Sequence, residues 1–166
     1  MTPSILIIED DLTFATMLKT WLGKKGFEVD TAGSSSRAKK QLSARSYDLI
    51  LSDLRLPDQD GIHLLVWLRS QSCTTPFIIM TSYAEIQTAV QAIKQGASDY
   101  IAKPVQPDEL LKKIKEAIQK SEVPATPSEA HIEKILRKVF WKVKVKQLTN
   151  YSVMSVWLPL LKCLFS

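Results

Sequence analysis

Residues 78–104, with the sequence IIMTSYAEIQTAVQAIKQGASDYIAKP, decide the fold of this chain. The segment begins inside the apolar run 77–80, which predicts a buried strand, and Asp99–Ala102 near its end predicts another. Between the two strands, residues 85–95 have the spacing of a helix. A strand, a helix and a second strand in this order are typical of parallel strands joined by a crossover helix.

The same alternation extends back to the start of the chain. Further strands are predicted at Ser4–Ile8, Glu28–Ala32 and residues 49–52, and helices at residues 14–22, 34–44, Gly61–Ser70 and Pro107–Lys120. The runs SILII, LILS and FIIM lack polar alternation, so both faces of those strands should be buried. Five strand–helix units in a row predict the α/β class, with an open five-stranded parallel sheet and helices on both faces.

Composition excludes several classes of protein. Hydrophobic residues make up 45% and charged residues 23% of the 166 residues, which argues against a disordered chain, a collagen-like repeat and a coiled-coil rod. The 5 glycines have neither of the two spacings of nucleotide-binding glycine loops. The 2 cysteines, Cys73 and Cys163, do not form a C-x-x-C metal or redox motif. No signal peptide opens the sequence, so we expect a cytoplasmic protein.

The chain divides into a predicted domain at residues 1–120, a linker at 121–130 and a basic tail at 131–166. The first 120 residues hold 15 Lys or Arg and 14 Asp or Glu, whereas residues 121–166 hold 7 and 3, so most of the net charge of +5 belongs to the last part. Residues 121–128 (SEVPATPS) have the Pro, Ser and Thr content of a linker. The apolar run 153–165 is shorter than the ~20 residues that cross a bilayer, so no transmembrane segment is expected.

Three interpretations of the tail stay open. It is a solvated amphipathic helix that rests on the domain or on a second copy, a segment that contacts DNA or an anionic membrane, or the remnant of a truncated or frame-shifted output module. DNA contact is disfavoured, because the segment is small and has no helix-turn-helix pattern.

The functional residues are predicted at the ends of the strands, because ligands of open parallel α/β sheets bind beyond the carboxyl ends of the strands. The first strand is followed by Glu9, Asp10 and Asp11, the third by Asp53, the fourth by Thr81 and the fifth by Lys103. Carboxylates packed closely repel one another unless a cation balances them, and Mg²⁺ prefers oxygen ligands. The acids therefore predict a divalent-ion site, and a lysine beside it suits transfer of a phosphoryl group to an aspartate.

Residues 1–120 resemble the receiver domain of bacterial two-component response regulators. Besides residues 78–104, the matching pieces are IIEDD at 7–11 and LSDLRLPDQDGI at 51–62. The segment 80–104 most resembles the receivers of NtrC-like enhancer-binding activators, in which an ATPase domain follows, yet no Walker A motif occurs in this chain. The resemblance implies a flavodoxin-like sheet of strand order 2-1-3-4-5. It also implies that a sensor histidine kinase or a phosphotransfer protein supplies the phosphoryl group.

The resemblance implies a role for each acid of the site. Asp53 would accept the phosphoryl group, and Mg²⁺ would be held by Asp10, Asp11, Asp53 and the backbone carbonyl of Arg55. Glu9 is expected to lie solvated at the rim rather than to bind the ion. Acids also favour helix N-termini, so Asp10 and Asp11 equally suit a capping role.

The remaining roles concern the conformational switch that would follow phosphorylation. Lys103 would contact the phosphoryl oxygens, Thr81 would move to hydrogen-bond the phosphoryl group, and Tyr100 would reorient with Thr81. The Lys103–Pro104 peptide bond would be cis. The signal would leave through the surface of the fourth helix, fifth strand and fifth helix, with a homodimer on phosphorylation as one candidate assembly.

Two other functions stay open: an aspartyl-phosphate phosphatase or phosphotransferase, and an interaction module that works without phosphorylation. The common Asp-x-Asp pattern of haloacid dehalogenases is absent after the first strand, where Asp10-Asp11-Leu12 stands. Because the predicted chemistry is directed at the side chain of Asp53 itself, the chain is not expected to be an enzyme.

Overall fold

Strands and helices alternate throughout the part of the chain that the structure describes. The computed structural model describes residues 2–82 and 86–120, and the predicted linker at 121–130 and tail at 131–166 lie outside them. The elements are β1 (Ser4–Ile8), α1 (Leu12–Lys24), β2 (Glu28–Ala32), α2 (Ser35–Ala44), β3 (Leu49–Asp53), α3 (Gly61–Ser70), β4 (Phe77–Thr81), α4 (Ile86–Lys94), β5 (Asp99–Ala102) and α5 (Pro107–Lys120). Among these helices, none is both long enough and apolar enough to span a bilayer.

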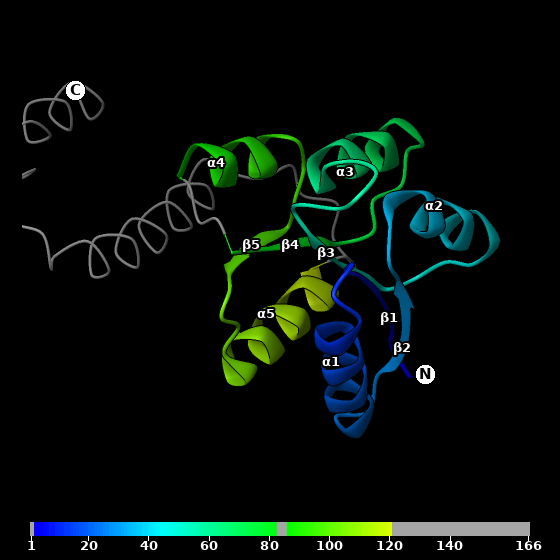
Figure 1. Cartoon of the computed structure of the whole chain (residues 1–166), viewed down its shortest axis with the longest axis vertical. Coiled ribbons are helices and arrows are strands. Elements are labelled where there is room, and N and C mark those ends of the chain that lie inside the picture. Colours follow the sequence, from blue (N-terminus) through cyan, green and yellow to red (C-terminus); the bar gives the residue numbers. More distant parts are fainter. Residues whose placement is uncertain (1, 83–85, 121–166) are drawn as a thin grey trace, which may run out of the picture.

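The strands form one parallel sheet in the order β2-β1-β3-β4-β5 (Figure 1), which confirms the predicted fold class and strand order. The chain runs outward from β1 to β2 and then returns to the other side of β1 with β3. The direction of winding therefore reverses between β1 and β3. The helices that follow β1 and β3 lie on opposite faces of the sheet, so the connections to them separate. This separation leaves room for a ligand between the ends of the two strands.

The predicted strand bounds hold with two small changes. β1, β2 and β5 have the predicted bounds, whereas β3 and β4 each extend one residue further, to Asp53 and Thr81. The extension occurs because Asp53 pairs with Met80, and Thr81 pairs with Ala102. Two site residues are thus part of the sheet rather than of the loops that follow it.

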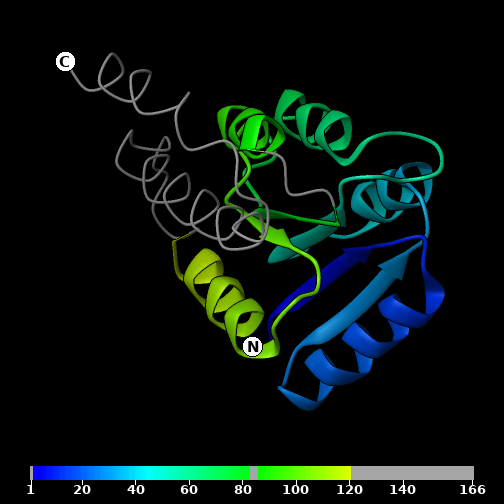
Figure 2. The ribbon, with the colours of Figure 1, turned by 60° about the vertical axis from the view of Figure 1, so that its left-hand side comes forward.

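Helices cover both faces of the sheet, with α2, α3 and α4 on one side and α1 and α5 on the other (Figure 2). Alternate residues of the central strands supply the two cores. Leu6, Ile8 and Ile50 pack in the core under α3 and α4, whereas Ile5, Ile7 and Leu51 pack in the core under α1 and α5. Burial on both faces explains why these strands are apolar without interruption.

Candidate functional site

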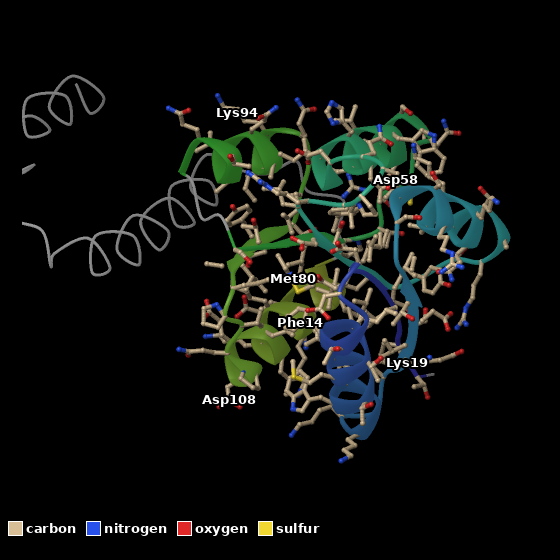
Figure 3. All side chains as sticks on the ribbon, in the orientation of Figure 1. Phe14, Lys19, Asp58, Met80, Lys94 and Asp108 are labelled. Carbon is tan, nitrogen blue, oxygen red and sulfur yellow. The ribbon has the colours of Figure 1, made fainter. Side chains whose placement is uncertain are left out.

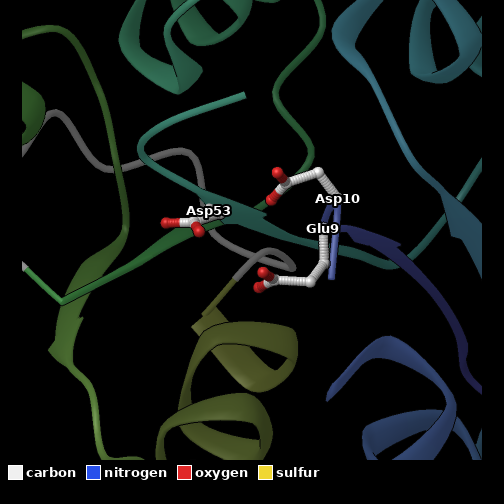
Figure 4. A group of neighbouring side chains, drawn as sticks. All are labelled: Glu9, Asp10 and Asp53. Atoms are coloured by element: carbon white, nitrogen blue, oxygen red, sulfur yellow. The ribbon is translucent and has the colours of Figure 1, made fainter. Parts of the chain in front are cut away.

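Three carboxylates come together where β1 and β3 end. Glu9 and Asp10 follow β1 directly, and Asp53 is the last residue of β3. One carboxylate oxygen of each residue lies within 4.8 Å of the other two (Figure 4). The two strand ends are level because Ile8 pairs with Ser52 in the parallel register. The structure therefore confirms that acids gather at the switch point of the sheet.

Lys103 also reaches this group, from its position directly after the edge strand β5. Its ammonium donates hydrogen bonds to Glu9 Oε2 at 2.7 Å and to Asp53 Oδ2 at 2.9 Å. Lys103 is held in place by its backbone N–H, which donates to the carbonyl of Thr81 at 2.7 Å. The peptide bond between Lys103 and Pro104 is cis, as the resemblance implied. The lysine thus reaches past β4 to the ends of β1 and β3.

Glu9 corrects one expectation, because it is not solvated at the rim. Its side chain is only 2% exposed and its carboxylate pairs with Lys103. Burial raises the pKa of Glu9, and the hydrogen bond from Lys103 opposes that rise. Burial alone would lower the pKa of Lys103, but the bonds and charges of Glu9 and Asp53 outweigh it and the pKa is raised. Lys103 is therefore held in its charged form beside Asp53.

Asp11 has the capping role that the sequence offered as the alternative to a metal ligand. Its carboxylate caps α1, where it accepts hydrogen bonds from the backbone N–H groups of Thr13 at 2.9 Å and Phe14 at 3.1 Å. These bonds satisfy donors that the first turn of a helix leaves open. Glu9, not Asp11, is the third member of the acid group described above.

The oxygen atoms of the acid group are ligands of the type that a hard divalent cation prefers. All three ligating atoms are carboxylate oxygens, the type that Mg²⁺ prefers, and the ion usually takes only one or two of them together with water. Asp10 is exposed and offers access from solvent, whereas Glu9 and Asp53 are partly neutralised by Lys103. Arg55 lies two residues after Asp53, in the loop that follows β3, and is exposed.

Thr81 and Tyr100 lie on the neighbouring strands β4 and β5, as the sequence predicted. Thr81 is the last residue of β4 and is 1% exposed, and Tyr100 on β5 is 3% exposed and belongs to the core under α3 and α4. The carbonyl of Tyr100 accepts a hydrogen bond from the buried Lys113 of α5 at 3.2 Å. Both candidate switch residues are thus buried, Thr81 at the end of β4 and Tyr100 on β5.

Gly61 lets the start of α3 approach Asp53. A Cβ atom at this position would lie 2.4 Å from the carbonyl oxygen of Asp53 and 3.1 Å from Oγ of Ser52. The same carbonyl accepts a hydrogen bond from the Ser52 hydroxyl at 2.8 Å. Only a residue without a side chain fits this contact, so Gly61 is a site residue that composition alone did not single out.

The loop between β3 and α3 is attached to α2 by Asp58 (Figure 3). The Asp58 carboxylate accepts hydrogen bonds from the backbone N–H groups of Ser35 at 2.9 Å and Ser36 at 2.8 Å, and from the Ser36 hydroxyl at 2.7 Å. Chiefly because of the bond from the Ser36 hydroxyl, the pKa of Asp58 is lowered to about 2. Asp58 therefore fixes the loop that begins at Asp53 against the N-terminus of α2.

Comparison with known proteins gives a consistent result. Residues 5–115 match the family described as the response regulator receiver domain. The regulatory protein AtoC of Escherichia coli K12 is 40% identical over 115 residues, which are 69% of this chain and 25% of AtoC. The transcriptional regulatory protein ZraR of Escherichia coli O157:H7 is 37% identical over 114 residues, which are 69% of this chain and 26% of ZraR. The chain thus spans about a quarter of the length of these relatives.

Solved structures agree with the sheet described above. The solution structure of the beryllofluoride-activated NtrC4 receiver domain dimer superposes with a TM-score of 0.68 at 28% identity. The alignment covers 71% of this chain and 98% of that one. Both comparisons concern the part of the chain that carries the acid group and Lys103.

Proposed function

The chain belongs to the response regulator receiver domains of two-component systems, and from this we propose that Asp53 is the side chain that accepts the phosphoryl group. Members of this family are phosphorylated on an aspartate by a histidine kinase or a phosphotransfer protein. The observation that carries the choice of Asp53 is its contact with Lys103, at 2.9 Å, inside a group of three carboxylates at the switch point of the sheet. This membership favours the receiver over the phosphatase alternative.

In the proposed reaction an oxygen of the Asp53 carboxylate attacks the phosphorus of a phosphohistidine. The new O–P bond forms as the P–N bond breaks, and the imidazole nitrogen keeps the electron pair and takes up a proton. The product is an acyl phosphate on Asp53. The side chain suits this role because β3 fixes its backbone, while part of the side chain (14%) stays exposed to solvent.

We propose that Asp10 and Asp53 hold Mg²⁺ together with the carbonyl of Arg55, with Glu9 as the buried neighbour that adds negative charge. When bound, Mg²⁺ neutralises charge on the phosphoryl oxygens during transfer. A direct role for Asp11 in holding the ion stays a prediction, since its carboxylate caps α1. Metal affinity of an Asp11→Asn variant tests it.

Lys103 and Thr81 are proposed to respond to the new charge. A phosphoryl group adds about −1.5 to −2 charges near neutral pH. The ammonium is already held between Glu9 and Asp53, so a short movement would bring it to a phosphoryl oxygen on Asp53. The Thr81 hydroxyl would then turn toward the phosphoryl group, and Tyr100 would follow into the space that opens. This pathway leads from the acid group to α4, β5 and α5.

The partners of this chain follow as proposals. A histidine kinase or phosphotransfer protein would donate the phosphoryl group, and the surface formed by α4, β5 and α5 would carry the signal. Dimerisation of the activated form is proposed by analogy with the NtrC4 receiver, whose solved structure is a dimer. We place the protein in the cytoplasm, where this family typically works.

Nuclear magnetic resonance of the isotope-labelled chain tests the proposal. Addition of Mg²⁺ should shift the backbone amides near Asp10 and Asp53, and beryllofluoride should then shift those of Thr81 and Lys103. Asp53→Asn should abolish the second set of shifts. Unchanged amides at Asp53 after both additions would contradict the proposed acceptor.

A further inference from the structure

An aromatic ring from α1 lies against the lysine of the site. Phe14 is the third residue of α1, and the centre of its ring is 4.6 Å from Nζ of Lys103. The same nitrogen is 2.7 Å from Glu9 Oε2 and 2.9 Å from Asp53 Oδ2. The ammonium therefore has two carboxylates and one aromatic face as neighbours.

Within residues 2–82 and 86–120, the contact is closer than two other pairs of a cation and an aromatic ring. Lys39 lies 5.2 Å from the ring of Trp67, and Arg45 lies 5.3 Å from the ring of Tyr47. The Lys103 side chain is also only 15% exposed, whereas that of Arg45 is 40% exposed. Cation–aromatic attraction is stronger when the cation is desolvated, so the interaction should be stronger at Phe14 than at Trp67 or Tyr47.

The position of Phe14 is fixed from two sides. Its backbone N–H donates to the Asp11 carboxylate at 3.1 Å, which anchors the first turn of α1 at the site. Its half-buried side chain packs against the core under α1 and α5. Figure 3 shows Phe14 at the site end of α1. The ring is thus held in place by both the backbone of α1 and the core.

An ammonium has three donors, and here two of them point to Glu9 and Asp53. The face of an aromatic ring can occupy the remaining side without taking a hydrogen bond away from either carboxylate. It also takes the place of water that would otherwise solvate the charge. Phe14 thereby limits the directions in which the Lys103 ammonium can move to those that lead toward Asp53.

We propose that Phe14 is a positioning residue for the phosphoryl chemistry at Asp53, acting through its contact with Lys103. The inference rests on the proposed function, because it assigns to Lys103 the task of binding a phosphoryl oxygen. It also gives Asp11 a second use: by capping α1, Asp11 holds the ring of Phe14 against the lysine.

The affinity for beryllofluoride in saturating Mg²⁺ tests the proposal. Phe14→Tyr keeps the aromatic face and should bind the probe within about twofold of the wild-type chain. Phe14→Leu keeps apolar bulk but loses the ring face, and should bind it about three- to tenfold more weakly. The matched control is Phe27→Leu, since Phe27 is another half-buried ring against the same core, outside the acid group. It should leave the affinity unchanged.

A second measurement reports on the contact without any ligand. Chemical denaturation of Phe14→Leu, Lys103→Met and the double variant should give non-additive losses of stability, because the two side chains interact. Additive losses, or equal probe affinities for Phe14→Leu and Phe14→Tyr, would overturn the role of Phe14. If the wild-type chain itself binds no beryllofluoride, the proposed function is overturned and this inference falls with it.

Discussion

The ammonium of Lys103 donates a hydrogen bond to the carboxylate of Asp53 over 2.9 Å, although Asp53 ends β3 and Lys103 follows β5, which are not neighbours in the sheet. β4 lies between them, and Lys103 reaches past it from the end of β5. The same nitrogen contacts Glu9 at the end of β1. One cation therefore connects the ends of three strands at the point where the sheet changes its direction of winding.

Removal of this cation should destabilise the protein in a way that Mg²⁺ can partly reverse. Lys103→Met leaves the carboxylates of Glu9 and Asp53 close together without a partner, which should cost about 3 kcal/mol of unfolding free energy. Because a divalent cation balances the same charges, the rise in Tm on addition of Mg²⁺ should be larger in Lys103→Met than in the wild-type chain. Thermal melts with and without Mg²⁺ measure both effects.

Lys112→Met is the matched control for this experiment. Lys112 lies on the exposed side of α5, where its side chain is 73% exposed, and its pair with Glu116 spans 3.9 Å. This variant should melt like the wild-type chain under both conditions. An equal response to Mg²⁺ in Lys103→Met and the wild-type chain would contradict a shared acid site.

Glu9→Gln should weaken Mg²⁺ binding. The substitution keeps the shape of a buried side chain but removes one of the three negative charges that surround the proposed ion. Supporting groups of this kind typically change metal affinity by about tenfold. Isothermal calorimetry measures the affinity, and Glu116→Gln on the exposed face of α5 is the control. Equal Kd values for Glu9→Gln and the control variant would show that Glu9 does not act on the ion.

Much of the fold could be predicted because strand pattern and chain order are local properties of the sequence. Unbroken apolar runs such as SILII identify strands that are covered on both faces, and the alternation with helices limits the sheet to parallel arrangements. The meeting of Asp10, Asp53 and Lys103 follows from that topology alone. Most of the site could therefore be predicted once the strand order was predicted.

The side chains next to the rim could not be predicted in the same way. Glu9 was expected in solvent because its residue type is charged, but its burial depends on Lys103, which lies 94 positions away in the sequence. Asp11 and Asp10 are neighbours of the same type, and only the start of α1 decides which of them caps the helix. The contact of Phe14 with Lys103 likewise depends on how far the Lys103 side chain reaches from the end of β5 toward the first turn of α1, and no local pattern predicts it.

Gly61→Ala should destabilise the protein. The new methyl group would lie 2.4 Å from the carbonyl oxygen of Asp53, so either α3 or the end of β3 must shift. Overpacking of this kind costs about 1–3 kcal/mol. Gly23→Ala is the control, since nothing lies within 4 Å of a Cβ there and alanine favours the helix α1. Chemical denaturation should show a loss for Gly61→Ala and no loss for Gly23→Ala, and equal behaviour would refute the close approach.

Asp58→Asn should lower the free energy of unfolding at neutral pH, and the difference from the wild-type chain should disappear in acid. The folded protein lowers the pKa of Asp58 from 3.8 to about 2, so the carboxylate stabilises the fold above pH 3.8 and this contribution is lost as the pH falls toward 2. Because Asp58 is exposed, the difference at pH 7 should be only about 0.5–1 kcal/mol. Denaturation curves of both proteins from pH 7 to 2 should converge, and a constant gap would contradict a role for the charge.

Phosphoryl transfer to Asp53 is the central claim, and mass spectrometry tests it most directly. The wild-type chain, Asp53→Asn and the exposed-site control Asp108→Asn are incubated with acetyl phosphate and Mg²⁺, and intact mass is followed by peptide mapping. The account predicts one phosphoryl group on the wild-type chain and on Asp108→Asn, located at Asp53, and none on Asp53→Asn. A phosphoryl group at another residue, or equal labelling of Asp53→Asn, would contradict it.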